Sequence, residues 1–274
     1  MLLTIDVGNT NMVFGIFQET NLLGTFRLST NSTATSDEIG VMAMAYFDRF
    51  GYNTGDVEAC IIGSVVPQIM YSLTSAIIKY FGVAPLVVGT DVDPGLKFDP
   101  RCYETGRLGT DRALDCIAAI EKYGPPFLVV DFGTATTIDA VDGSGVYLGG
   151  TIGPGLQVSL DALVSRTAAL PRVELQMPST VLGRNTVEQI QAGIMAGYVG
   201  NMEYLIRRTK EAMGTPDVKV IATGGLSRMI AQQTDQIDIV DARLTLDGLQ
   251  MLFDRNRDAK PIEIKNNDEE EVST

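Results

Sequence analysis

The sequence predicts an α/β protein made of two related halves with a ligand cleft between them, and three observations support this. Apolar runs of strand type alternate with segments whose apolar residues recur at helical spacing over most of the 274 residues. Residues 2–10 recur in pattern at 127–135, a shift of 125 residues. Two prolines precede the second copy, at Pro125-Pro126. We therefore expect domains over 1–124 and 125–265, followed by a disordered acidic tail over 266–274.

Each half is expected to open with three strands. In both copies an apolar run ends in Asp-x-Gly followed by Asn or Thr, and a second alternating segment follows, at 13–17 and 138–141. The same shift carries Gly24 onto Gly149, each within a further short strand. Such a repeat indicates that the two halves share one arrangement of strands.

A fourth strand and several helices complete each half. Residues 60–64 correspond weakly to 220–224, and both segments lead into glycine-containing turns. Pro67 is typical of a first helical turn, and Gly51 and Gly82 are typical of the position just past a last turn. Thr110 is expected to cap a third helix. Helices are predicted at 36–50, 67–81, 110–123, 157–167, 186–213, 227–233 and 246–256.

The composition excludes several kinds of site. The chain has no histidine, which excludes Ser-His-Asp and Cys-His catalysis, histidine-ligated zinc and haem with a proximal histidine. The three cysteines lack C-x-x-C spacing and indicate neither a disulfide framework nor a metal site. A net charge of −13 disfavours nucleic-acid binding. No apolar stretch approaches the roughly 18 residues of a membrane span, so we expect a cytoplasmic protein.

The two Asp-x-Gly turns have the composition of phosphate-binding loops. In the first, Gly8 lets the backbone bend close to a ligand, while Asn9, Thr10 and exposed amides can donate hydrogen bonds to phosphate oxygens. Asp6, at the end of the strand, is suited to hold Mg²⁺ through water. Each loop alone is also typical of an ordinary turn between strands. Two copies with one polar signature favour a nucleotide clamp, with 131–137 as the second loop.

Four segments together resemble the type III pantothenate kinase family. They are Asp-x-Gly-Asn-Thr at 6–10, Gly-Thr-Asp-Arg at 109–112, Asp-Phe-Gly-Thr-Ala-Thr-Thr at 131–137 and the glycine-rich run at 149–155. The resemblance spans about 1–254 and implies the duplicated ribonuclease-H-like fold of the acetate-kinase, sugar-kinase, Hsp70 and actin superfamily. It also implies a homodimer that transfers the γ-phosphoryl group of ATP to pantothenate, giving 4′-phosphopantothenate in the first step of coenzyme A synthesis.

The same resemblance implies roles for particular residues. The ATP-binding set comprises Asp6, Val7, Gly8, Asn9, Thr10, Asn11, Met12, Val13, Thr134, Gly224 and Gly225. The pantothenate-binding set comprises Tyr103, Gly109, Thr110, Asp111, Arg112 and Thr186. Asp111 matches the base that accepts the proton of the pantothenate hydroxyl, and Arg112 would bind the substrate carboxylate or the phosphoryl group. Asp131 matches a monovalent-cation site, for K⁺ or NH₄⁺.

Each of these residues also has a purely structural interpretation. Asp111 in a first helical turn is stabilised by the helix dipole, and Arg112 could form a surface ion pair. Thr186 and Gln189 have the spacing of a capping box for the helix that follows. Gly224-Gly225 can equally serve a tight turn between strand and helix.

Two further questions remain open at the level of sequence. Gly193, Ala196, Gly197 and Gly200 form a small-residue stripe that would admit a close helix, either within the chain or from a second subunit. Phosphate loops recognise ATP but not the acceptor, so a sugar or acetate remains an alternative. A regulatory accessory protein of a transcriptional activator, using the same nucleotide cleft as a switch, is the alternative from another class.

Overall fold

The computed structural model describes residues 1–102, 108–215 and 217–261. The predicted substrate residue Tyr103 and the predicted disordered tail lie outside these ranges. Among the described residues, no helix combines the length and the apolar character that crossing a membrane requires.

The chain forms two compact units. The first comprises Met1–Pro94 with the C-terminal segment from Leu249, and the second comprises Gly95–Gly248. This division differs from the expected boundary after residue 124. Helix α3 (Thr110–Tyr123) contacts strands β7 (Phe127–Phe132) and β8 (Ala135–Val141), so it belongs with the second sheet although it precedes it in the chain.

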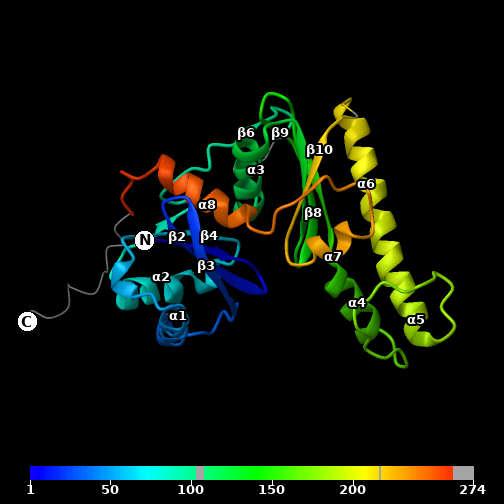
Figure 1. Ribbon diagram of the computed structural model, residues 1–274, viewed down its shortest axis with the longest axis horizontal. Coiled ribbons are helices and arrows are strands. Elements are labelled where there is room, and N and C mark those ends of the chain that lie inside the picture. The colour runs from blue at the N-terminus through cyan, green and yellow to red at the C-terminus, as the bar shows by residue number, and fades with distance from the viewer. Residues whose placement is uncertain (103–107, 216, 262–274) are drawn as a thin grey trace, which may run out of the picture. The chain divides into compact units, whose positions relative to one another are not determined.

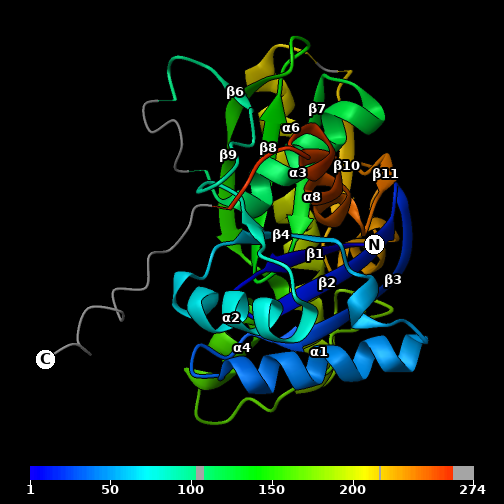
Figure 2. The ribbon, with the colours of Figure 1, turned by 90° about the vertical axis from the view of Figure 1, so that its left-hand side faces the viewer.

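The first unit is a five-stranded sheet with two helices packed on one face (Figure 2). Its strand order is β3-β2-β1-β4-β5. The strands are β1 (Leu2–Val7), β2 (Asn11–Gln18), β3 (Asn21–Ser29), β4 (Ala59–Ser64) and β5 (Leu86–Val87). The helices are α1 (Ser36–Phe50) and α2 (Met70–Phe81), with short 3₁₀ turns at Thr54–Asp56 and Pro67–Ile69. Leu3, Ile5 and Val7 alternate into the core, as period-2 patterning requires.

The second unit is a six-stranded sheet with helices on both faces (Figure 1). Its strand order is β11-β10-β7-β8-β9-β6. The further strands are β6 (Lys97–Phe98), β9 (Val146–Pro154), β10 (Lys219–Thr223) and β11 (Ile239–Val240). The further helices are α4 (Leu156–Ser165), α5 (Thr186–Gln191), α6 (Gly197–Met213) and α7 (Ser227–Ala231), with a π-helical turn at Ala192–Ala196 between α5 and α6. Helix α8 (Leu244–Arg255) runs from this unit into the first.

The predicted duplication is confirmed by the strand order of the two sheets and by matching irregularities in their strand pairing. The order β3-β2-β1-β4-β5 is matched by β9-β8-β7-β10-β11, with β1 parallel to β4 and β7 parallel to β10. The β2–β3 pairing shifts register just after Ile16 pairs with Gly24, and the β8–β9 pairing shifts just after Ala140 pairs with Gly149. Equivalent bulges at equivalent glycines indicate that the two sheets follow one plan.

One predicted helix cap is wrong by a residue. Helix α5 begins at Thr186, but its cap is Asn185, whose side chain accepts a hydrogen bond from the Glu188 amide at 3.0 Å. The Glu188 carboxylate accepts from the amide of Arg184, so the proposed box between Thr186 and Gln189 does not form. Asn and Thr both make good caps, and the backbone places Asn185 in the required extended conformation.

Candidate active site

A charged cluster lies on the face of the second sheet that α3 covers. Leu128, Val130 and Phe132 pack into the core on the opposite face, so alternation along β7 directs Asp131 toward α3. Along β8 the same alternation directs Asp139 to that face, since Ile138 and Ala140 lie in the core. These carboxylates therefore come from two adjacent strands and meet the first turn of one helix.

Helix α3 brings Asp111 and Arg112 to this cluster. Its N-cap is Gly109, which has no side-chain cap, and Thr110 is the first helical residue rather than the cap that the sequence suggested. The Arg112 amide donates a hydrogen bond to Asp111 Oδ1 at 2.8 Å. This contact holds the Asp111 carboxylate at the positive end of the helix dipole.

Arg112 forms a buried ion pair rather than a surface one. Its Nε donates to both oxygens of Asp139 at 3.1 Å, and its Nη2 donates to Asp139 Oδ1 at 2.6 Å and to the Tyr147 hydroxyl at 3.1 Å. The Arg112 and Asp139 side chains are only 14% and 2% exposed. Our reading of the sequence missed Asp139 and Tyr147. A charged residue inside the apolar strand 138–141 was the available signal, because buried carboxylates are almost always paired.

Burial and repulsion between like charges raise the pKa values of two carboxyl groups in this cluster. Burial raises the pKa of Asp111, although the neighbouring Arg112 partly opposes the shift. Burial, followed by the charges of Asp111 and Asp139, raises the pKa of Asp131 to about 7. Asp139 pairs with the Arg112 guanidinium, while the pKa values of Asp111 and Asp131 are raised, so the cluster is suited to cations and to accepting a proton.

The predicted adenosine turn lies directly against Asp131. Gly224 follows β10 with φ +87°, and a Cβ there would lie 2.3 Å from Asp131 Oδ1 and 2.7 Å from the Phe132 backbone. The amide and hydroxyl of Ser227 donate to the Gly224 carbonyl and start α7. Gly224 is therefore required by the turn itself. A Cβ on Gly225 would meet nothing within 4 Å, so Gly225 is the glycine with open space for a ligand.

The second Asp-x-Gly turn meets the start of another helix. The Gly133 amide donates to the Ala135 carbonyl at 3.1 Å, closing the turn between β7 and β8. Gly155, the N-cap of α4, donates from its amide to the Thr134 carbonyl at 3.0 Å. Thr134 itself is exposed. The turn thus brings an exposed hydroxyl close to a helix N-terminus, an arrangement suited to anions.

The first Asp-x-Gly turn has the corresponding position in the first unit. The Gly8 amide donates to the Asn11 carbonyl at 3.0 Å, and the Thr30 hydroxyl donates to the Gly8 carbonyl at 2.6 Å. Asn9 and Thr10 are exposed. Val7 and Met12 are almost fully buried, so within the predicted ATP segment these two would contact a ligand through their backbone alone.

Thr186 is not brought to the charged cluster. It is exposed at the start of α5, and the continuous helix through α6 packs on the sheet face opposite α3 (Figure 1). Within the described ranges, no hydrogen bond joins Thr186 to Asp111, Arg112 or Asp131. Nor does any group of three or more Asp, Glu or Cys side chains there lie close enough to bind a metal unaided. A metal at this site would need phosphate or water oxygens as additional ligands.

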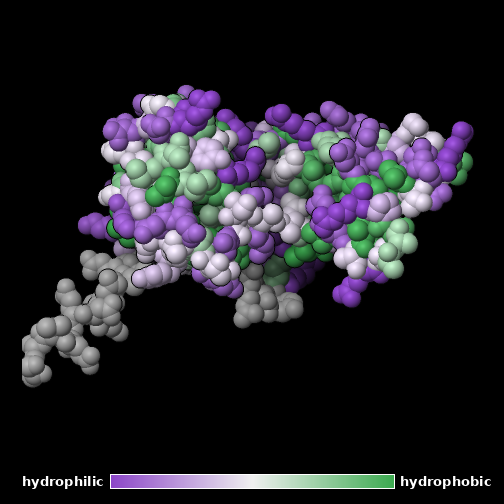
Figure 3. Space-filling model, turned by 90° about the horizontal axis from the view of Figure 1, so that it is seen from below, coloured by the Kyte–Doolittle hydropathy of each residue, from purple (hydrophilic) through white to green (hydrophobic). Residues whose placement is uncertain are grey.

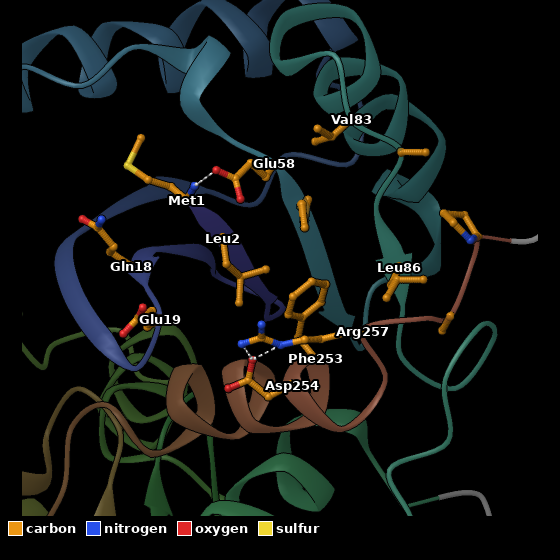
Figure 4. A pocket seen from close by; sticks show the side chains of 15 residues that line it. Met1, Leu2, Gln18, Glu19, Glu58, Val83, Leu86, Phe253, Asp254 and Arg257 are labelled. Atoms are coloured by element: carbon orange, nitrogen blue, oxygen red, sulfur yellow. Dashed lines mark hydrogen bonds and ion pairs between the residues drawn. The ribbon is translucent and has the colours of Figure 1, made fainter.

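A cavity of about 670 Å³ in the first unit lies elsewhere (Figure 4). It is lined by Met1 and Leu2 at the beginning of β1, whereas the Asp-x-Gly turn follows the other end of that strand. Its charges are largely paired, since the N-terminal ammonium lies 3.4 Å from Glu58 and Arg257 donates to Asp254. The cavity contains none of the predicted site residues.

Comparisons with known proteins agree with the motifs. A model of the type III pantothenate kinase family matches residues 2–208. The type III pantothenate kinase of Bacillus cytotoxicus is 45% identical over 257 residues, which cover 93% of this chain and 97% of that protein.

Solved structures show the same fold at low identity. A Sinorhizobium meliloti protein assigned as a 2-dehydro-3-deoxygalactonokinase aligns with a TM-score of 0.63 and 12% identity, over 97% of this chain and 100% of that one. A Campylobacter jejuni protein assigned to the Baf family of transcriptional activators aligns with a TM-score of 0.58 and 19% identity, over 93% and 99%. These likenesses confirm the predicted actin-like, sugar-kinase-like fold and carry no further meaning for activity.

Proposed function

Because this chain belongs to the type III pantothenate kinase family, we propose a specific role for each residue of its charged cluster. The protein is a kinase that transfers the γ-phosphoryl group of ATP to pantothenate, the reaction that begins coenzyme A synthesis. Phosphoryl transfer depends mainly on positioning and on neutralising charge, with proton removal from the acceptor as a smaller demand. A site without histidine can meet both demands with carboxylates and an arginine.

Asp111 is proposed as the base. Its carboxylate is held by the Arg112 amide at the start of α3, and burial raises its pKa above the usual value of an aspartate. A base is most effective when its pKa lies near the working pH, because a large fraction is then ionised and its affinity for a proton is still high. This held, desolvated carboxylate beside a guanidinium is the observation that carries the proposal. The pantothenate hydroxyl would donate its proton to Asp111, while Gly109, Thr110 and Arg112 contact the rest of the substrate.

The two Asp-x-Gly turns are proposed to bind the phosphates of ATP with its divalent metal. Exposed Asn9, Thr10 and Thr134 supply donors, and Gly225 leaves open space for the nucleoside. Mg²⁺ typically uses one or two carboxylates together with phosphate and water oxygens, which suits Asp6. When bound, the metal neutralises charge on the phosphates. Asp131, with its raised pKa among like charges, is suited to a monovalent cation such as K⁺ or NH₄⁺.

ADP release with a panel of acceptors tests this function. Purified protein with ATP, Mg²⁺ and K⁺ is expected to release ADP with pantothenate at least 100-fold faster than with hexoses, sugar acids or acetate. Mass spectrometry should then detect 4′-phosphopantothenate. Equal or faster turnover with another acceptor would assign the phosphate loops to a different kinase. Stable association with another protein without pantothenate-dependent ADP release would favour the regulatory alternative, which the family comparisons do not support.

A homodimer is proposed from one exposed face of the α5–α6 helix. Gly193, Gly197 and Gly200 are exposed, and a Cβ at any of them would meet nothing within 4 Å. Tyr204, 53% exposed, continues this stripe at helical spacing. Exposed apolar residues of the same unit add to the surface: Val158, Val181, Leu182 and Val187. Figure 3 shows hydrophobic side chains among polar ones on the right-hand part of the surface seen from below. A second copy would cover this face, and Thr186 would contact substrate in that assembly.

The Gly197→Leu variant separates assembly from folding. Its side chain meets open space within one chain, so the subunit is expected to fold and melt like the wild type. In a close helix–helix contact the same side chain would hold two subunits apart. Light scattering on a sizing column should therefore report two chains for the wild type and one for the variant. Ala45→Leu, on the exposed face of α1, is the matched control and should remain dimeric. A monomeric wild type would contradict the proposal.

The proposal also includes a cytoplasmic location and the absence of nucleic-acid partners. A cytoplasmic location is supported by three cysteines that are all free thiols, Cys60, Cys102 and Cys116. The acidic charge of −13 supports the absence of nucleic-acid partners, since like charges repel.

A further inference from the structure

We propose that Asp139 is a positioning residue that orients Arg112 toward the anionic group of the substrate, and that Tyr147 and Gly150 complete this arrangement. The inference rests on the proposed role of Arg112 in binding substrate. Asp139 and Tyr147 lie outside the motifs on which the function was assigned, Arg112 and Gly150 lie within them, and all four belong to the second unit.

The hydrogen bonds leave one edge of the Arg112 guanidinium for a ligand. A guanidinium has five N–H donors. The Nε donor and both Nη2 donors are used by Asp139 and Tyr147. Among the described residues, no hydrogen bond uses Nη1. The Arg112 side chain keeps 14% of its surface exposed, which is where a ligand could reach it. Arg112 thus presents two N–H donors at the accessible side of the site, and these suit a carboxylate or phosphoryl oxygen.

Asp139 and Tyr147 form a closed arrangement around the other edge. The Tyr147 hydroxyl accepts from Arg112 Nη2 and donates to Asp139 Oδ1 at 2.9 Å. Thr137 donates a further hydrogen bond to Asp139 Oδ2. Burial and the Asp139 charge raise the pKa of Tyr147, so its hydroxyl remains a donor throughout the working pH range. Because Asp139 and Tyr147 are hydrogen-bonded both to Arg112 and to each other, they hold the guanidinium in one orientation.

Gly150 makes room for this ion pair. It pairs directly with Asp139 across the β8–β9 ladder. A Cβ at Gly150 would lie 2.8 Å from Arg112 Nη2 and 2.9 Å from Asp139 Oδ1, as well as 2.3 Å from a backbone oxygen. The guanidinium therefore lies over the one residue type that admits it. This gives the glycine-rich run at 149–155 a function in the pantothenate half of the site, beyond the strand bend at Gly149.

Two variants and their combination test the inference. Asp139→Asn keeps the size of the side chain but removes its charge. Arg112→Lys keeps the charge, but the lysine ammonium lacks the planar guanidinium that can bind Asp139 along one edge and substrate along the other. Each is expected to raise the KM for pantothenate about tenfold or more and to leave the KM for ATP within twofold. If Asp139 acts through Arg112, adding Asp139→Asn to Arg112→Lys should cost less than a further twofold in kcat/KM. Independent, multiplying effects in the double variant would overturn the inference.

A matched control lies at the other end of the same helix. Lys122 of α3 is held by the buried carboxylates of Asp241 and Asp247. Asp247→Asn removes a comparable buried charge and is expected to lower thermal stability without changing the KM for pantothenate. If Asp247→Asn raised that KM as much as Asp139→Asn, the effect would be structural and the inference would fail.

A milder variant covers the case in which Asp139→Asn does not fold. Tyr147→Phe keeps the ion pair and removes one hydrogen-bond partner from each member, so the KM for pantothenate should rise about threefold. An unchanged KM in a folded Tyr147→Phe, or in a folded Asp139→Asn, contradicts the inference. An unchanged KM in Arg112→Lys instead contradicts the proposed substrate role of Arg112, which separates the two failures.

Discussion

The Asp111→Asn variant is expected to lose between about 100-fold and 10,000-fold in kcat, the range typical of removing a general base. The amide has the size and shape of the carboxylate, but it cannot accept the proton of the pantothenate hydroxyl. Since the Arg112 amide can still donate to the remaining oxygen, the start of α3 should keep its structure. Quenched-flow or steady-state ADP release measures the loss, and binding of pantothenate by calorimetry should persist.

The pH profile distinguishes a base from a merely structural carboxylate. The pKa of Asp111 is raised, so wild-type kcat/KM should fall as the pH drops through that raised value, whereas the residual activity of Asp111→Asn should lack this limb. Histidine cannot produce the limb, because the chain contains none. Asp48→Asn, an exposed carboxylate on α1, is the control and should behave as wild type. A kcat within threefold of wild type in folded Asp111→Asn would remove Asp111 from the mechanism.

The Asp131→Asn variant is expected to gain stability at pH 8 while losing activity. Asp131 has a pKa of about 7 in the folded protein, against about 3.9 for an unfolded aspartate. The folded state therefore binds more protons than the unfolded state between these values, and this group's contribution to stability falls as the pH rises from about 4 to 7. A difference of three pKa units lowers the free energy of unfolding by at most about 4 kcal/mol at high pH. Asparagine carries no charge, so the Asp131→Asn variant would not lose this free energy.

Thermal melts across pH measure this effect. Without added cation, Asp131→Asn should melt several degrees above wild type at pH 8, and the difference should vanish by pH 4, where the aspartate is protonated. K⁺ should narrow the difference at pH 8 by stabilising the ionised wild type, if Asp131 holds the cation as proposed. Melting temperatures that differ equally at pH 4 and pH 8 would show that the charge of Asp131 is not the cause.

Local signals were sufficient for most elements of the fold. Pro67, Gly51 and Gly82 mark helix ends where the structure has them, since caps and first turns depend on a few consecutive residues. Thr186 shows where such signals stop. Two adjacent residues, Asn185 and Thr186, are both suitable caps, and the backbone conformation selects the first.

The candidate site likewise contains residues that local motifs predict and residues that they do not. Asp111, Arg112 and Asp131 were identified because they lie in short polar motifs next to predicted strand and helix ends. Asp139 and Tyr147 were not, because they reach Arg112 from 27 and 35 residues further along the chain through strand pairing and helix packing. No local pattern predicts which partner a buried charge will find.

The sequence by itself determined the duplicated order of strands and helices and the two polar turns that follow β1 and β7. These features depend on periodicity and turn chemistry that act over a few residues. Only the tertiary structure decided that α3 belongs to the second sheet, that Arg112 is buried against Asp139 rather than exposed, and that Gly224 and Gly150 are needed for space. Burial and close approach arise when remote segments pack together, so they exist only once the chain has folded.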